Sequence, residues 1–150
     1  MRITDGTALA IRYPLEQPIG DSAHDLSMYE LAVVTIRTDE GITGSGFNSG
    51  IHGGAVVMAT AIEQMIAPAL IGKDPFHVRG LWEEMYRRTR VVGRSGVTRL
   101  AIAAVEIALW DIMGKALRAP LWKSFGGTGR ASASRCTTRT PAGSASPRTR

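Results

Sequence analysis

The chain has little cysteine, few aromatic residues and no long apolar run. Its 150 residues include one cysteine, Cys136, which excludes an internal disulfide and favours a reducing compartment. No apolar stretch approaches the roughly 20 residues that span a bilayer. Residues 1–5 also lack the basic and apolar regions of a secretory leader. We therefore expect a cytoplasmic protein that does not contact a membrane.

Acidic and large apolar residues are both absent from residues 128–150. This segment has no Leu, Ile, Val, Met or aromatic residue, and it holds five of the 18 basic residues but none of the 13 acidic ones. The formal net charge of +5 therefore belongs to this segment, and residues 1–127 are formally neutral. Because it has no core to bury, we expect residues 128–150 to be a disordered tail.

Motifs for phosphate or metal binding are missing from the first 127 residues. The glycine-rich residues 41–46 lack a GK[ST] ending and lead into no immediate helix, so they do not predict a phosphate loop. Glu83 and Glu84 diverge by about 100° on a helix, which favours solvated surface over a metal site. The residues by themselves predict no catalytic group and no metal ligand.

Apolar alternation predicts three strands near the start of the chain. A β-rich segment, a short glycine-containing turn and a returning segment predict a β-hairpin over residues 30–47. Gly44 and Gly46 in its second strand predict a close approach of another backbone or a bulge. A further strand is expected within residues 2–12, whereas two prolines predict a long loop over residues 13–29.

Three or four helices are expected after the strands. Residues 48–54 are expected to form a mobile loop, and a first helix follows until Pro68 stops it. Asp74 is the predicted cap of a second helix, with proline at its first position. A third helix is predicted over residues 97–118. This order predicts an α+β domain, in which a three-stranded antiparallel sheet is followed by a bundle of three to four helices.

The longest predicted helix carries a stripe of small apolar residues. Its members are Ala101, Ala104, Val105, Ala108, Leu109 and Ile112. Their i, i+3, i+4 spacing predicts that the stripe is buried, and small side chains let another element approach closely. Asp111 and Lys115 are spaced as an i,i+4 ion pair, worth about 0.2–0.5 kcal/mol.

The residue identities in this helix carry a resemblance as well. Residues 101–126 read AIAAVEIALWDIMGKALRAPLWKSFG. This run resembles the N-terminal signature of the mandelate racemase/muconate lactonizing enzymes, a branch of the enolase superfamily, except that Ser124 stands where that pattern has Leu. The resemblance covers residues 1–127 and implies the N-terminal capping domain of that family.

The resemblance implies an enzyme that removes the proton α to a carboxylate and stabilises the enediolate with Mg²⁺. In that family the base and the metal ligands lie on a (β/α)8 barrel, which needs roughly 200 residues or more. We therefore expect this chain to bind no metal by itself, to contain no catalytic residue and to be inactive alone. A truncation or a frameshift after residue 127 is our hypothesis for the missing barrel. Residues 86–110 look most like the acid-sugar dehydratases, although racemases share much of this domain.

The resemblance also implies a lid over the barrel mouth. In such enzymes the loops that match residues 19–24 and 48–53 exclude water and contact the distal end of the substrate. The candidate specificity residues are Ile19, His24, Asn48, Ile51 and His52. The histidines are expected to hydrogen-bond a hydroxyl-rich acid and the isoleucines to form an apolar wall. The alternative is that all of these are ordinary exposed loop residues.

Two other interpretations remain open. One is a non-enzymatic binding fragment whose arginine-rich tail contacts polyanions in a salt-dependent way, although no recognised nucleic-acid motif supports it. The other is an inert pseudogene product. For the full-length family we expect an acid-sugar-like carboxylate as the substrate and a homo-oligomer as the assembly.

Overall fold

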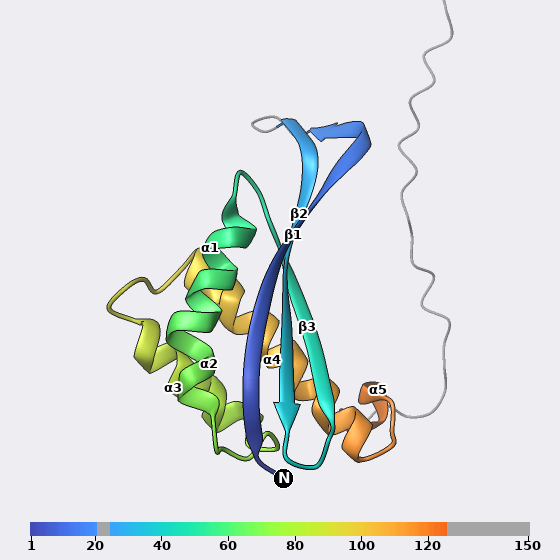
Figure 1. The fold of residues 1–150 in the computed structure, drawn as a ribbon, viewed down its shortest axis with the longest axis vertical. Helices are drawn as coiled ribbons and strands as arrows, with labels where there is room; N and C mark the ends of the chain where they lie inside the picture. Colours follow the sequence, from blue (N-terminus) through green and yellow to red (C-terminus); the bar gives the residue numbers. More distant parts are fainter. Residues whose placement is uncertain (21–24, 126–150) are drawn as a thin grey trace, which may run out of the picture.

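A three-stranded antiparallel sheet lies against helices in this computed structural model, which describes residues 1–20 and 25–125 (Figure 1). The strands are neighbours in chain order and span Ile3–Gly20 (β1), Asp25–Thr38 (β2) and Thr43–Gly50 (β3). The helical segments are α1 (Gly54–Ala61), the π-helical turn η1 (Ile62–Ile66), α2 (Ala67–Leu70), α3 (Val78–Thr89), α4 (Val97–Ala116) and α5 (Leu121–Ser124). The predicted α+β class is confirmed, and the described residues contain no (β/α)8 barrel.

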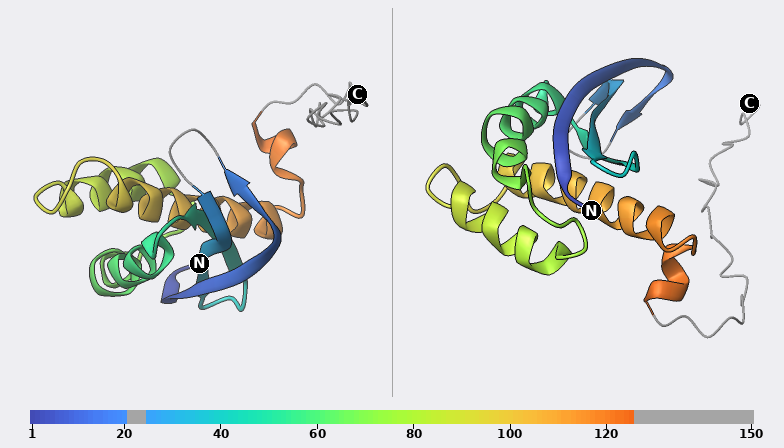
Figure 2. Two further views of the ribbon diagram at one scale, coloured as in Figure 1. Left: turned by 90° about the horizontal axis from the view of Figure 1, so that it is seen from above. Right: turned by 60° about the horizontal axis from the view of Figure 1, so that its bottom comes forward.

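The helices lie on one side of the sheet (Figure 2). α4 packs against β3 and β2, α1 packs against β1, β2 and α4, and α3 packs against α4. The predicted stripe of small residues on α4 is fully buried in this layer, which confirms the prediction. None of the described helices is both long and apolar enough to span a bilayer.

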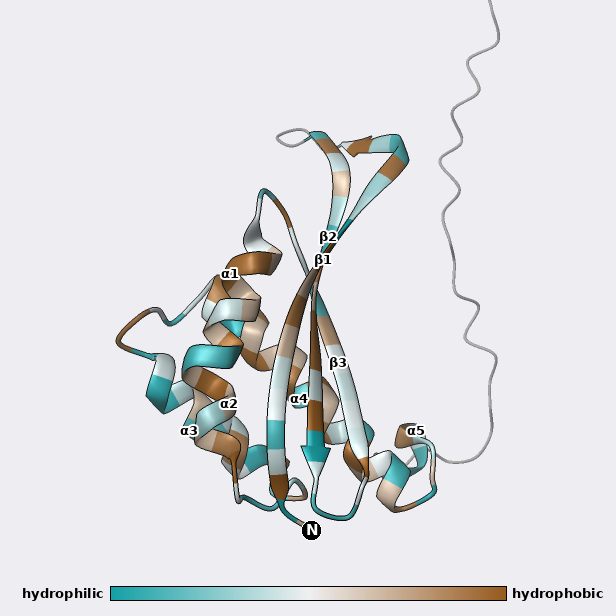
Figure 3. Cartoon of the chain, viewed as in Figure 1, coloured by the Kyte–Doolittle hydropathy of each residue, from teal (hydrophilic) through white to brown (hydrophobic). Residues whose placement is uncertain are grey.

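Strand β2 shows the period of two that divides a sheet into two faces. Ala32, Val34 and Ile36 are buried under the helices, whereas the residues between them are only partly buried. Figure 3 shows apolar residues along this part of the strand and on the helices that cover it. The helix-covered half of the sheet is therefore fixed by apolar packing.

Gly44 and Gly46 lie where β3 crosses α4, and the predicted close approach is confirmed. A Cβ added at Gly44 would run into the carbonyl oxygen of Ala108, and one at Gly46 into that of Ala104. Both glycines are buried, so the strand and the helix backbone touch directly. Only residues without a side chain allow this contact.

The ion pair predicted on α4 also forms, and it does more than join two helical residues. Lys115 Nζ lies 2.6 Å from Asp111 Oδ2. Asp111 accepts a hydrogen bond from the Ser45 amide at 2.8 Å, and Lys115 donates one to the Thr43 carbonyl at 2.8 Å. The pair therefore satisfies backbone groups on the outer edge of β3, which has no further strand beside it.

The long loop predicted over residues 13–29 is wrong. β1 continues to Gly20 and β2 begins at Asp25, so the two strands form a hairpin that extends beyond the helices (Figure 1). Pro14 pairs with Met28, and the register is interrupted until Ile19 pairs with Leu26. The prolines are tolerated because β1 is an edge strand, where a missing N–H breaks no central ladder.

Two predicted loop and helix boundaries are also wrong. The helix does not stop at Pro68, because the π-helical turn η1 leads directly into α2, which carries Pro68 in its first turn and continues to Leu70. The loop predicted over residues 48–54 is shorter, since β3 runs to Gly50 through its pairing with Glu30.

The third wrong boundary is the start of α3. Asp74 does not cap it: its Oδ1 accepts a hydrogen bond from the Phe76 amide at 2.9 Å within a turn, and the helix begins at Val78. A side chain that bonds a nearby amide offers the backbone an alternative to a helix, and here that alternative is taken.

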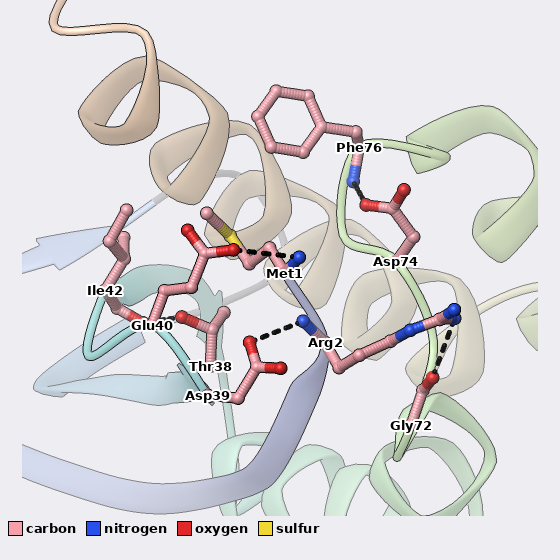
Figure 4. A network of polar contacts seen from close by, with 9 residues as sticks. All are labelled: Met1, Arg2, Thr38, Asp39, Glu40, Ile42, Gly72, Asp74 and Phe76. Carbon is pink, nitrogen blue, oxygen red and sulfur yellow. Dashed lines mark hydrogen bonds and ion pairs between the residues drawn. The ribbon is translucent and has the colours of Figure 1, made fainter.

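A polar network closes the end of the sheet that carries the N-terminus (Figure 4). The Met1 amino group lies 2.9 Å from Glu40 Oε1, and the Arg2 amide donates to Asp39 Oδ1 at 2.7 Å. Arg2 also donates to the Gly72 carbonyl at 3.2 Å. These contacts tie the first residues to the β2–β3 turn and to the loop after α2.

Candidate lid site

The two segments predicted as a lid emerge at the same end of the sheet, opposite the N-terminus (Figure 1). One is the β1–β2 hairpin from Arg12 onward, which includes Ile19 of the predicted 19–24 loop. The other is the residue 51–53 turn between β3 and α1, because the first part of the predicted 48–53 loop belongs to β3. The register explains the proximity, because Glu30 pairs with Arg12 on one side and with Gly50 on the other. The sheet itself therefore brings the two segments together.

The predicted contact residues take different positions in this region. Ile19 is 58% exposed on the hairpin and Ile51 is 44% exposed in the turn. His52 is exposed in the same turn and has a left-handed φ of 51°. Asn48 belongs to β3, where its Nδ2 donates to the Leu100 carbonyl at 3.2 Å, so it binds the first turn of α4. His24 lies outside the described residues, as does the predicted tail of residues 128–150.

Glu30 is the residue at this end that the sequence analysis missed. Its side chain is 2% exposed, and its Oε2 accepts a hydrogen bond from the Gly53 amide at 2.9 Å. Its Oε1 accepts from Arg12 Nε at 3.1 Å and forms an ion pair with Arg12 Nη2 at 3.0 Å. One carboxylate thus contacts both lid segments.

The environment of Glu30 keeps it charged. Burial raises the pKa of its carboxyl, but hydrogen bonds from the Gly53 and Ala55 amides and the charge and hydrogen bond of Arg12 outweigh burial, so the pKa lies below its ordinary value. A buried carboxylate with several donors is stable as the anion. Each of these donors in turn gains a charged acceptor, which makes stronger hydrogen bonds than a neutral one.

A signal for Glu30 was present in the sequence. The period of two that places Ala32, Val34 and Ile36 inward also places Glu30 inward, two residues before the first of them. A charged residue at an inward position of a strand needs a partner, and Arg12 is too far along the chain for a local pattern to show it. The pairing of β1 with β2 supplies that partner.

A small polar cleft lies between the hairpin and the turn. Its volume is about 150 Å³, and its lining residues are Arg12, Asp25, Leu26, Ser27, Met28, Glu30 and His52. Ligand pockets in proteins usually measure about 300–1,000 Å³, so the cleft is too small to enclose a sugar acid. It is suited to contact one end of such a molecule, with the remaining walls supplied from elsewhere.

Comparison with curated proteins identifies relatives of this domain. Residues 4–126 match the family model described as mandelate racemase/muconate lactonizing enzyme, N-terminal domain. The 3,6-anhydro-alpha-L-galactonate cycloisomerase of Streptomyces coelicolor is 38% identical over 117 residues, which are 77% of this chain and 32% of that protein. The arabinonate dehydratase of Saccharolobus solfataricus is 34% identical over 82% of this chain and 30% of its own length.

Solved structures give the same relationship. An L-talarate dehydratase from Polaromonas sp. JS666, complexed with Mg and L-glucarate, has a TM-score of 0.76 and 31% identity, over 83% of this chain and 35% of that one. A racemase from Streptomyces coelicolor with bound magnesium has a TM-score of 0.80 and 35% identity, over the same shares of the two chains. The chain therefore spans about a third of the length of the relatives that it matches.

The described residues do not fit a magnesium ion. Among residues 1–20 and 25–125, no group of three or more His, Cys, Asp or Glu side chains is placed to hold a metal. Glu83 and Glu84 pair with Arg79 and Lys73 respectively, in agreement with a solvated surface. We therefore assign no metal-dependent step to these residues.

Proposed function

Because the chain belongs to the mandelate racemase/muconate lactonizing enzyme family, we propose that residues 1–127 are the capping domain of a magnesium-dependent enolase-superfamily enzyme. The reaction is removal of the proton α to the carboxylate of an acid sugar, in a dehydratase or racemase. Residues 128–150 are assigned to a separate segment. The base and the metal ligands belong to a barrel that the described residues do not include.

The observation that carries the proposal is the meeting of both lid segments in one polar cleft. Arg12 and His52 border this cleft from different segments, and they supply hydrogen-bonding groups of the kind that bind hydroxyls and carboxylates. Relatives that act on acid sugars, and one solved with L-glucarate bound, support this substrate class. The role of the domain is to exclude water and to contact the distal end of the substrate.

The 150-residue chain is inactive alone under this proposal. Purified chain is expected to show no turnover of acid sugars with Mg²⁺ and no Mg²⁺ binding by calorimetry at millimolar metal. Light scattering tests the homo-oligomer proposed for the assembly. The alternative, a polyanion-binding fragment, depends on arginines outside the described residues and stays a prediction, which a salt titration of binding to random DNA tests.

A chimera tests the function directly. Residues 4–126 replace the matching N-terminal segment of the Streptomyces coelicolor cycloisomerase, whose remaining length supplies the barrel. We expect the chimera to exchange the α-proton of acid sugars in D₂O, with a substrate preference shifted from that of the parent. His52→Ala in the chimera should raise KM more than it lowers kcat, because it removes a contact and no reacting group.

Two results would refute the proposal. One is turnover of a hydroxy-acid by the isolated chain with Mg²⁺, because the barrel would then be unnecessary. The other is a folded chimera that binds Mg²⁺ and exchanges no α-proton on any of a panel of acid sugars. The unmodified cycloisomerase serves as the matched control for metal binding and proton exchange.

A further inference from the structure

The turn between β3 and α1 has an unusual backbone and an exposed surface. His52 and Gly53 both have left-handed φ values, 51° and 87°. Ile51 and His52 are exposed on the surface of this turn. The backbone bonds within the turn are local, such as that from the Gly54 amide to the Ile51 carbonyl at 2.9 Å.

The Gly53 amide of this turn points toward the buried carboxylate of Glu30. It donates to both carboxylate oxygens, at 2.9 Å to Oε2 and 3.1 Å to Oε1, and the Ala55 amide also lowers the pKa of Glu30. A left-handed non-glycine residue such as His52 costs about 1–3 kcal/mol and persists only where its surroundings impose it. Glu30 is a buried group that binds this turn from outside it.

The other side of Glu30 faces the hairpin. Arg12 lies opposite it in the β1–β2 register and binds its Oε1 through both Nε and Nη2. The Arg12 side chain is 56% exposed, so Glu30 orients a guanidinium that still faces solvent at the cleft. Glu30, on β2 at the base of the hairpin, therefore binds both the opposite strand β1 and the residue 51–53 turn.

We propose that Glu30 is a positioning residue that couples the residue 51–53 turn to the β1–β2 hairpin, so that the two lid segments move as one unit. The coupling is a property of this chain. Only its consequence, a fixed spacing of Arg12 and His52 for substrate, rests on the proposed function. Glu30 borders the cleft, but its carboxylate is buried and bonded to the Gly53 amide and Arg12, so its role is to hold these groups in place.

Amide hydrogen exchange by NMR on the full 150-residue chain tests the coupling. Glu30→Gln keeps the size of the side chain and removes the charge. We expect exchange at the Gly53 and Ala55 amides to rise more than tenfold, and amides of residues 26–29 in the hairpin to exchange several-fold faster. Core amides such as Ile102 should keep their protection, which separates local release from global destabilisation.

Matched variants keep the test decisive. Glu40→Gln removes an exposed carboxylate at the opposite end of the sheet and should leave the lid amides unchanged. Arg12→Met retains Glu30 and should raise the exchange rates of amides in both segments several-fold. This variant tests the coupling even if Glu30→Gln does not fold. Unchanged exchange at Gly53 and Ala55 in a folded variant would overturn the proposal. Release of the turn without any change in the hairpin would overturn it equally.

The chimera separates this inference from the proposed function. Glu30→Gln in the chimera should raise KM for the acid sugar with a smaller change in kcat, because substrate contacts are displaced while the reacting groups remain. Coupled exchange in the chain together with an unchanged KM would leave the coupling established and remove its role in substrate binding. An active chimera together with uncoupled exchange in the chain would refute the coupling and leave the proposed function standing.

Discussion

The two ends of the sheet are held together in different ways. At the N-terminal end, several exposed groups join three segments, and the apolar core lies directly behind them (Figure 4). At the lid end, the hairpin extends beyond the helices, and the buried carboxylate of Glu30 binds both Arg12 on β1 and the Gly53 amide of the turn. The comparison indicates that polar contacts add little to the rigidity of the backbone where apolar packing already fixes it. Where the apolar packing ends, they determine how the segments are held.

The largest expected effect is in the packed region between the ends. Gly46→Ala should lower the free energy of unfolding by about 3 kcal/mol or more, because the new methyl group meets the α4 backbone, which cannot move aside as a side chain can. Gly80→Ala in α3 is the control, since nothing lies within 4 Å of its Cβ position. It should stabilise the protein by up to about 1 kcal/mol. Urea unfolding measures both, and a neutral Gly46→Ala would show that β3 and α4 do not touch.

Acid should release the contacts of Glu30 at the lid end. The folded-state pKa of Glu30 is lowered, so its contribution is present above the ordinary value of 4.5 and is lost as the pH falls through the folded value. Exchange and chemical shifts of the Gly53 amide, followed below pH 5, should report this loss. Arg12, Asp25 and His52 also line the cleft, so Glu30→Gln is the control: its Gly53 signal should lose this transition. A transition that persists in this variant would assign the effect to one of the other groups.

Base should release the N-terminal end instead. The hydrogen bond that the Met1 amino group donates to Glu40, followed by smaller contributions of the Glu40, Asp39 and Asp74 charges, outweighs desolvation and raises the pKa of the Met1 amino group above 8.0. Its contribution is therefore present below pH 8.0 and is lost as the pH rises through the raised value. Chemical shifts of the residue 39–41 turn should report the loss, while the lid amides should not respond. Glu40→Gln should reduce this response, and an equal response of both ends would remove the contrast between them.

The smallest expected effect concerns an exposed ion pair on the sheet. Arg37 Nη1 lies 2.6 Å from Asp5 Oδ2, and both side chains are about half exposed. Asp5→Asn should lower the free energy of unfolding by less than about 1 kcal/mol, because solvent already screens the pair. Urea unfolding at low and high salt checks this value. A loss of several kcal/mol would show that exposed polar contacts contribute more to the stability of the N-terminal end of the sheet than we infer.

The sequence predicted the features that depend on neighbouring residues. The β-hairpin over residues 30–47, the buried stripe of α4 and the Asp111–Lys115 pair all follow from spacing along the chain, and the structure has them. Gly44 and Gly46 predicted a close approach because only the absence of a side chain permits one. The family was recognisable for the same reason, since its signature lies in one continuous segment.

The features that decide the lid depend on residues far apart in the chain. Prolines predicted a loop over residues 13–29, but the described residues of this range belong to β1 and β2, which pair with each other, and β1 tolerates its prolines at the edge of the sheet. Glu30 had a predictable inward orientation, yet its partners Arg12 and Gly53 come from 18 residues before it and 23 after it. Local patterns fix which way a side chain points, whereas the group it meets is fixed only when the sheet register and the helix layer bring distant segments together.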